Sequence, residues 1–124
     1  MSTPPRSSLI RAPSHVLTPR AGKEAGQAYR TAAGIQKNNL NDLIDAPLNM
    51  QKAFNMFRKI DPATAIECIQ VTIDCYTSAG NFRRAASHVE TAAEVLEVEM
   101  GDRKRAMEFY NRAAQWYEDD GAKA

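Results

Sequence analysis

The chain has 124 residues, of which 44% are hydrophobic and 25% charged, and its formal net charge is +1. This length allows one domain with a modest core, and no apolar run approaches the about 18 residues that a membrane-spanning helix requires. The charges are unevenly distributed, because residues 1–20 contain three arginines and no acidic residue, which leaves 13 basic against 15 acidic residues in the remainder. We therefore expect a soluble chain, and its bulk charge gives no support to nucleic-acid binding.

Residues 1–21 have the composition of a disordered tail. Pro4, Pro5, Pro13 and Pro19 stand among serines and arginines, and the few apolar residues cannot offset the entropy lost when the backbone becomes ordered. The prolines also oppose the amphipathic helix of an organelle transit peptide. Since no apolar signal region precedes the domain either, the simplest location is the cytoplasm.

Two helices are predicted in the first part of the remaining chain. The first runs from about residue 23 to 37 and ends at the polar residues 37–39, and Asp45 is predicted to cap the second, with Pro47 inside its first turn. The apolar positions follow helical spacing. They are Ala25, Ala28, Tyr29, Ala32, Ala33 and Gln36 in the first helix, and Met50, Ala53, Phe54 and Phe57 in the second.

Three further helices are predicted after Asp61. Asp61 and Pro62 form a helix start, since the carboxylate accepts from backbone N–H groups and proline gives up a donor that has no partner there. Gly80 closes this third helix, Asn81 caps the fourth, which ends at Gly101, and Asp102 caps the fifth. The buried positions of the third helix are predicted to be Ala65, Ile66, Ile69, Ile73 and Tyr76; those of the fourth are Phe82, Ala85, Ala86, Val89, Ala92, Ala93 and Leu96; those of the fifth are Ala106, Phe109, Tyr110, Ala113, Trp116 and Tyr117.

The stretch from Ala65 to Gly121 repeats itself at an offset of 41 residues, with Tyr76 recurring as Tyr117 and Gly80 as Gly121. A period of this size is typical of stacked helical hairpins, and it exceeds the about 34 residues of a tetratricopeptide repeat. We therefore predict an all-α, tetratricopeptide-like α-solenoid of about five helices over residues 22–121. Because the last helix has no following partner, we expect a truncated stack that leaves Phe109, Tyr110 or Trp116 partly uncovered.

The ordered series of motifs resembles the alpha-SNAP family, the soluble NSF attachment proteins. No single motif is diagnostic, and the likeness covers roughly residues 22–121. The residues that carry it are Ala53-Phe54, Arg58-Lys59-Ile60-Asp61-Pro62, Ala65-Ile66, Tyr76-Thr77, residues 80–86, residues 93–97 and residues 104–110.

The resemblance implies an adaptor without an active site, and not an enzyme. The family lays basic side chains on the assembled four-helix SNARE bundle and recruits the ATPase NSF, which takes the bundle apart. Arg58, Lys59, Arg83 and Arg84 stand at matching positions and are the predicted partner-binding residues. The resemblance also implies a position peripheral to vesicle and organelle membranes, reached through the SNAREs.

Departures from the family limit what the resemblance implies. Ser87 replaces a lysine that touches the bundle in some relatives, and no counterpart of the family's membrane-touching loop is recognisable near the N-terminus. The family's NSF-engaging region corresponds to sequence beyond Ala124. The alternative hypothesis is therefore a truncated fragment without NSF-recruiting activity, which self-associates or competes with a full-length protein.

The remaining candidate residues have structural explanations. Arg58 and Lys59 also suit a helix C-terminus through the helix dipole, whereas Arg83 and Arg84 lie near a helix N-terminus, where cations are disfavoured. Neither His15 nor His88 has a metal-ligand partner at a recognisable spacing. Cys68 and Cys75 lie seven residues apart on one predicted helix, too far for a disulfide, and are assigned to packing. No metal or cofactor is expected.

Overall fold

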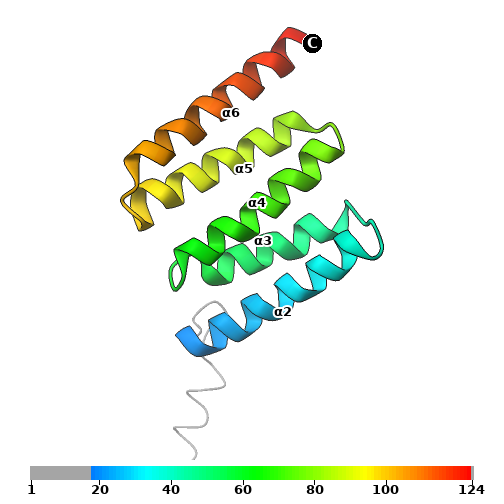
Figure 1. The fold of residues 1–124 in the computed structure, drawn as a ribbon, viewed down its shortest axis with the longest axis vertical. Coiled ribbons are helices and arrows are strands. Elements are labelled where there is room, and N and C mark those ends of the chain that lie inside the picture. Colours follow the sequence, from blue (N-terminus) through cyan, green and yellow to red (C-terminus); the bar gives the residue numbers. More distant parts are fainter. Residues whose placement is uncertain (1–17, 124) are drawn as a thin grey trace, which may run out of the picture.

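The computed structural model describes residues 18–123, which form five α-helices and one short π-helix. Figure 1 shows the α-helices side by side in one layer, each antiparallel to the one before it and packed against it. The prediction of an all-α stack of antiparallel hairpins is confirmed. The elements are α2 (Pro19–Asn38), α3 (Asp45–Phe57), α4 (Pro62–Ser78), α5 (Phe82–Glu94), η1 (Val95–Glu99) and α6 (Arg103–Lys123).

Helix α2 begins at Pro19, four residues before the predicted start. The Thr18 hydroxyl accepts a hydrogen bond from the Ala21 amide at 3.1 Å, and Pro19 at the first helical position has no N–H to satisfy. Residues 19–21 of the predicted tail are therefore helical. Residues 1–17, which include His15, lie outside the described part of the chain.

The buried face of α2 differs from the predicted one. Ala28 and Ala32 are exposed, whereas Gly22, Gly26 and Ala33 are buried. A Cβ atom added at Gly26 would lie 2.7 Å from Cε2 of Phe57 in α3, closer than real contacts allow. The glycines therefore let α2 approach α3 closely, which is why the alanine-based prediction of the face was partly wrong.

Side-chain caps begin most of the helices where predicted. The Asn81 side chain accepts from the Arg84 amide at 3.2 Å, and Asp102 accepts from the Arg105 amide at 3.1 Å. The prediction for α3 was wrong, because Asp45 is already helical. Asp42 caps this helix instead, and its Oδ1 accepts from the amides of Ile44 at 3.0 Å and Asp45 at 2.9 Å.

Asp61 caps α4 as predicted. Its carboxylate accepts from the Thr64 hydroxyl at 2.7 Å and from the Thr64 amide at 3.3 Å. The hydroxyl's hydrogen bond is the main reason why the pKa of Asp61 lies below its ordinary value of 3.8, an effect that desolvation opposes. The charged form is thus the one that the folded state favours.

Replacing Asp61 with alanine is expected to lower the free energy of unfolding by about 1 kcal/mol at neutral pH, because the cap is lost. A carboxylate whose pKa is depressed on folding stabilises the protein above its unfolded-state pKa. The difference between parent and variant should therefore shrink as the pH falls below 3.8 and through the folded-state pKa. Urea denaturation across this range measures it, with Asp61→Asn as the control that keeps a capping acceptor. A difference that is independent of pH would contradict the role of the carboxylate.

Helix α4 lies in the middle of the layer and supplies much of the core. It is buried on two sides, against α3 and against α5. The predicted apolar positions of α3 and α4 are all buried, and Cys68 and Cys75 are fully buried as packing residues. The buried residues of α4 are Ala65, Ile66, Cys68, Ile69, Thr72, Ile73, Cys75 and Tyr76.

The end of α5 departs from regular α-helix. Residues Val95–Glu99 form η1, in which the Met100 amide donates to the Val95 carbonyl at 3.1 Å, and the chain then turns at Gly101 with a φ of 66°. Val95 and Leu96 are fully buried beneath this turn. π-Helical turns are rare and occur mostly as single turns inside α-helices.

Helix α6 forms one edge of the described layer and packs mainly against α5 and η1. Phe109 is buried, while Tyr110 and Trp116 are half-buried, so the prediction that one of these three rings is partly uncovered is confirmed for the latter two. Gly121 does not repeat the role of Gly80, because Gly80 has a φ of 78° and Gly121 lies within α6. None of the described helices is both long and apolar enough to cross a bilayer.

Candidate functional site

Arg58 and Lys59 lie at the C-terminal end of α3, where the chain turns toward α4. The Arg58 guanidinium lies 5.9 Å from the centroid of the Phe54 ring, one helical turn earlier. The Lys59 side chain is 82% exposed, and its Nζ lies 3.7 Å from Oε1 of Glu99 in η1. Because exposed ion pairs contribute little to stability, Lys59 can exchange this carboxylate for one from a partner at small cost.

Arg83 and Arg84 lie in the first turn of α5. The Arg83 side chain is 71% exposed and forms an ion pair with Asp120 of α6 at 3.5 Å. The Arg84 guanidinium lies 5.6 Å from the centroid of the Tyr76 ring in α4. Both arginines thus extend over neighbouring helices, and neither cation gains from the helix dipole at this end.

The four predicted residues do not form one cluster. The α3–α4 turn and the α5–α6 turn lie at one edge of the layer, and the α4–α5 turn lies at the opposite edge (Figure 1). The Lys59–Glu99 pair belongs to the first edge and Arg83 to the second. Residues 83 and 99 are separated by about 24 Å along the helix axis at about 1.5 Å per residue. The structure therefore brings together Arg58 with Lys59, and Arg83 with Arg84, as two separate basic pairs.

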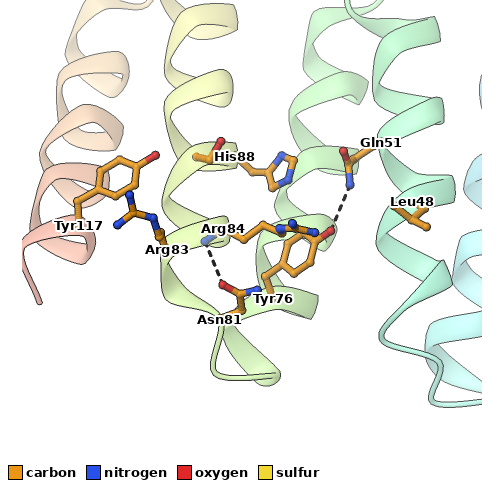
Figure 2. Close-up of a pocket in the computed structure, with 9 residues that line it drawn as sticks. Leu48, Gln51, Tyr76, Asn81, Arg83, Arg84, His88 and Tyr117 are labelled. Carbon is orange, nitrogen blue, oxygen red and sulfur yellow. Dashed lines mark hydrogen bonds between the residues drawn. The ribbon is translucent and has the colours of Figure 1, made fainter. Parts of the chain in front are cut away.

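The second pair borders a cleft of about 530 Å³. Figure 2 shows the Arg84 side chain extending across Tyr76, and Arg83 pointing toward Tyr117. Ser87, noted in the sequence as a departure from the family, also lines this cleft. The lining residues are Leu48, Gln51, Tyr76, Asn81, Arg83, Arg84, Ser87, His88 and Tyr117.

Tyr76 and His88 form the floor of the cleft. Their rings are stacked, with centroids 5.4 Å apart and planes only 4° from parallel, and the Gln51 amide donates to the Tyr76 hydroxyl at 3.5 Å. Burial, and then the nearby Arg84 cation, lower the pKa of His88 below 6.5, so its imidazole is neutral near pH 7. The sequence analysis treated Tyr76 as a core residue and assigned no role to Gln51 or His88, because their meeting depends on the packing of three helices.

Metal ligation and thiol chemistry find no support in the described part of the chain. Among its residues no group of three or more His, Cys, Asp or Glu side chains is arranged to hold a metal ion. Burial raises the pKa of both thiols, Cys68 and Cys75, which keeps them protonated and poorly nucleophilic.

Comparison with known proteins identifies the family. Residues 11–124 match the family model described as soluble NSF attachment protein, SNAP. The chain is 44% identical over 115 residues to a probable vesicular-fusion protein sec17 homolog of Neurospora crassa, covering 93% of this chain and 39% of that protein. It is 35% identical over 96 residues to the human alpha-soluble NSF attachment protein, covering 77% of this chain and 32% of that protein.

A viral protein is also similar. The soluble NSF attachment protein homolog FPV033 of fowlpox virus is 37% identical over 98 residues, which cover 79% of this chain and 34% of the viral protein. In these comparisons the chain spans between 32% and 39% of the relative's length. Because the family model matches nearly the whole chain, the match to the SNAP family does not depend on a short motif. The chain belongs to the SNAP family of soluble NSF attachment proteins.

Proposed function

We propose that this chain is an adaptor of vesicular transport that binds the assembled four-helix SNARE bundle and is not an enzyme. The observation that carries the proposal is the match of residues 11–124 to the SNAP family model. Relatives named as vesicular-fusion proteins and NSF attachment proteins support it. Through the SNAREs, the chain would associate peripherally with vesicle and organelle membranes.

The two basic pairs are the proposed contacts with the bundle. Arg58 with Lys59 and Arg83 with Arg84 lie at opposite edges of the helical layer, and the side chains of Lys59 and Arg83 are largely exposed. A partner that touches both pairs must span about 24 Å along α5 and η1, at about 1.5 Å per residue. An elongated acidic bundle meets this requirement. Charge attraction over such a distance favours fast, orientable association.

Recruitment of NSF is proposed only for the family's full-length architecture. The chain spans 39% of the Neurospora relative and 32% of the human one. The proposal for the described residues is therefore bundle binding alone.

Self-association is a second candidate, favoured by the outer side of α6. Met107 is 62% exposed there, and Tyr110 and Trp116 are half-buried. A fragment that pairs through this side would act as a competing scaffold.

A pull-down with an assembled SNARE bundle tests the proposal. We expect binding at low salt that weakens at moderate salt, because the Debye length falls from about 30 Å at 0.01 M to about 10 Å at 0.1 M. The double variants Arg58→Glu, Lys59→Glu and Arg83→Glu, Arg84→Glu should each weaken binding by about tenfold or more, since each replaces attraction with repulsion.

The matched control is Arg103→Glu, Lys104→Glu, which changes the net charge equally at two exposed residues of α6. An equal loss in this control would show that bulk charge, and not the two pairs, determines binding. If the parent chain does not bind at low salt, the adaptor proposal is wrong. A concentration-dependent increase in mass in sedimentation analysis would then favour self-association.

A further inference from the structure

The cleft beside Arg83 and Arg84 has an unbalanced charge. Its lining contains these two guanidinium groups and no carboxylate. Asp120 lies beside Arg83 at 3.5 Å and offsets part of one charge only. No ion pair is found for Arg84 among the described residues, where its guanidinium lies over the Tyr76 ring. The cleft is therefore a place where an anion gains electrostatic energy.

A second cleft shows that this imbalance is not general. The cavity of about 330 Å³ between α2 and the start of α4 contains Lys23 and Arg30, but also Glu24 and Asp61. Its cations are matched by carboxylates in the same lining. Of the two clefts, only the one at α5 combines arginines with a lining free of acidic side chains.

Helix stability does not explain the position of these arginines. The first turn of α5 contains Arg83 and Arg84 and no acidic residue. At a helix N-terminus the dipole disfavours cations by about 0.3–1 kcal/mol each. The pair therefore opposes local stability, as expected of residues that serve binding.

Neutral hydrogen-bond donors complete the lining. Ser87 supplies a hydroxyl, and the NH₂ group of Asn81 remains a donor because its oxygen already accepts from the Arg84 amide. The Tyr76 hydroxyl accepts from Gln51, so its own hydrogen is available to a ligand. The neutral His88 ring contributes one N–H. These donors come from two helices and the turn between them.

The size and the donor set indicate the class of ligand. A single carboxylate is satisfied by one bidentate guanidinium, whereas a phosphate offers several oxygens to donors arriving from different directions. The volume of about 530 Å³ suits a small molecule more than a lone ion. We propose that this cleft binds a small molecule bearing phosphomonoester groups, of the inositol phosphate class, either free in solution or as a lipid headgroup.

Tyr76 prepares the cleft for such a ligand. Its ring is stacked on His88 and lies beneath Arg84, which restricts the guanidinium before binding. A pre-positioned guanidinium loses less freedom when it forms hydrogen bonds, so more of the interaction energy remains as affinity. This inference does not depend on the SNARE proposal, and the two can fail separately.

Isothermal titration calorimetry with inositol hexakisphosphate tests the inference. The parent chain should bind, and Arg83→Gln, Arg84→Gln should weaken the affinity by about tenfold or more, because charged hydrogen bonds are lost. The variant Arg103→Gln, Lys104→Gln removes the same charge at two exposed residues elsewhere and should stay within about twofold of the parent. Circular dichroism confirms that both variants remain folded.

Vesicle flotation separates the two sources of the ligand. Phosphatidylcholine vesicles containing phosphatidylinositol 4,5-bisphosphate are compared with vesicles made equally anionic with phosphatidylserine. Flotation with the first kind alone, lost in Arg83→Gln, Arg84→Gln, assigns the lipid headgroup, whereas calorimetric binding without flotation assigns the free compound. No calorimetric binding by the parent chain, or an equal loss in both double variants, overturns the inference.

Discussion

Replacing Ile69 with alanine is expected to lower the free energy of unfolding by about 2–5 kcal/mol, the largest effect of any substitution considered for this chain. Ile69 is 1% exposed and belongs to the core cluster of the central helix α4, which is buried on two sides. The neighbouring helices cannot close the cavity without losing their contacts with each other. Since domains are stable by only about 5–15 kcal/mol, the loss is a large fraction of the total.

Urea denaturation followed by circular dichroism measures this effect. Ile44→Ala is the matched control, because it removes the same atoms from a side chain that is 78% exposed. The control should change the free energy of unfolding by at most about 0.5 kcal/mol. Similar losses at Ile44 and Ile69 would contradict the assignment of Ile69 to the core.

Replacing Gly26 with alanine is expected to destabilise the protein by about 1–3 kcal/mol, although alanine is the better helix former. The new Cβ would meet three atoms of the buried Phe57 ring at 2.7–3.0 Å. Phe57 is only 3% exposed and lies in the core, so its ring can move only by displacing neighbours. Helices α2 and α3 would have to separate.

Gly34 in the same helix provides the opposite result. Nothing lies within 4 Å of a Cβ added there, so Gly34→Ala should stabilise the protein by about 0.5–1 kcal/mol through helix propensity alone. Thermal unfolding of the two variants compares the signs directly. A stabilising Gly26→Ala would show that α2 does not pack on α3 as closely as the structure indicates.

The helices could be predicted from the sequence because their signals are local. The caps at Asp61, Asn81 and Asp102 act on amides three residues ahead, and the apolar positions of α4 recur at helical spacing. Two local signals competed at the start of α3, where Asp42 and not Asp45 caps the helix. The caps alone could not decide this, because both aspartates precede the apolar positions.

The contact face of α2 could not be derived in this way. The prediction followed the alanines, but the buried positions are glycines selected by the size of the Phe57 ring. That choice depends on the partner helix, which the spacing within α2 does not contain. The same limit applies to the stacking of Tyr76 on His88, which joins α4 to α5.

The division of the predicted basic residues into two pairs was within reach of the sequence. In a stack of antiparallel hairpins, consecutive turns alternate between the two edges. Residues 58 and 59 precede one turn and residues 83 and 84 follow the next, so they belong to opposite edges. The partners that neutralise Lys59 and Arg83, namely Glu99 and Asp120, could be assigned only once the helices were placed.

The π-helical turn η1 makes the α5–α6 hairpin sensitive to chain length. Its wider backbone accommodates residues that a regular α-helix over Val95–Glu99 would place elsewhere around the axis. Deleting one residue there would rotate everything that follows by about 100°, the angle per residue of an α-helix. Phe109 and Ala113 would then leave the side of α6 that faces α5. Homologous chains with this packing must therefore keep the residue count of η1, whereas the exposed turn between α2 and α3 is free to lengthen.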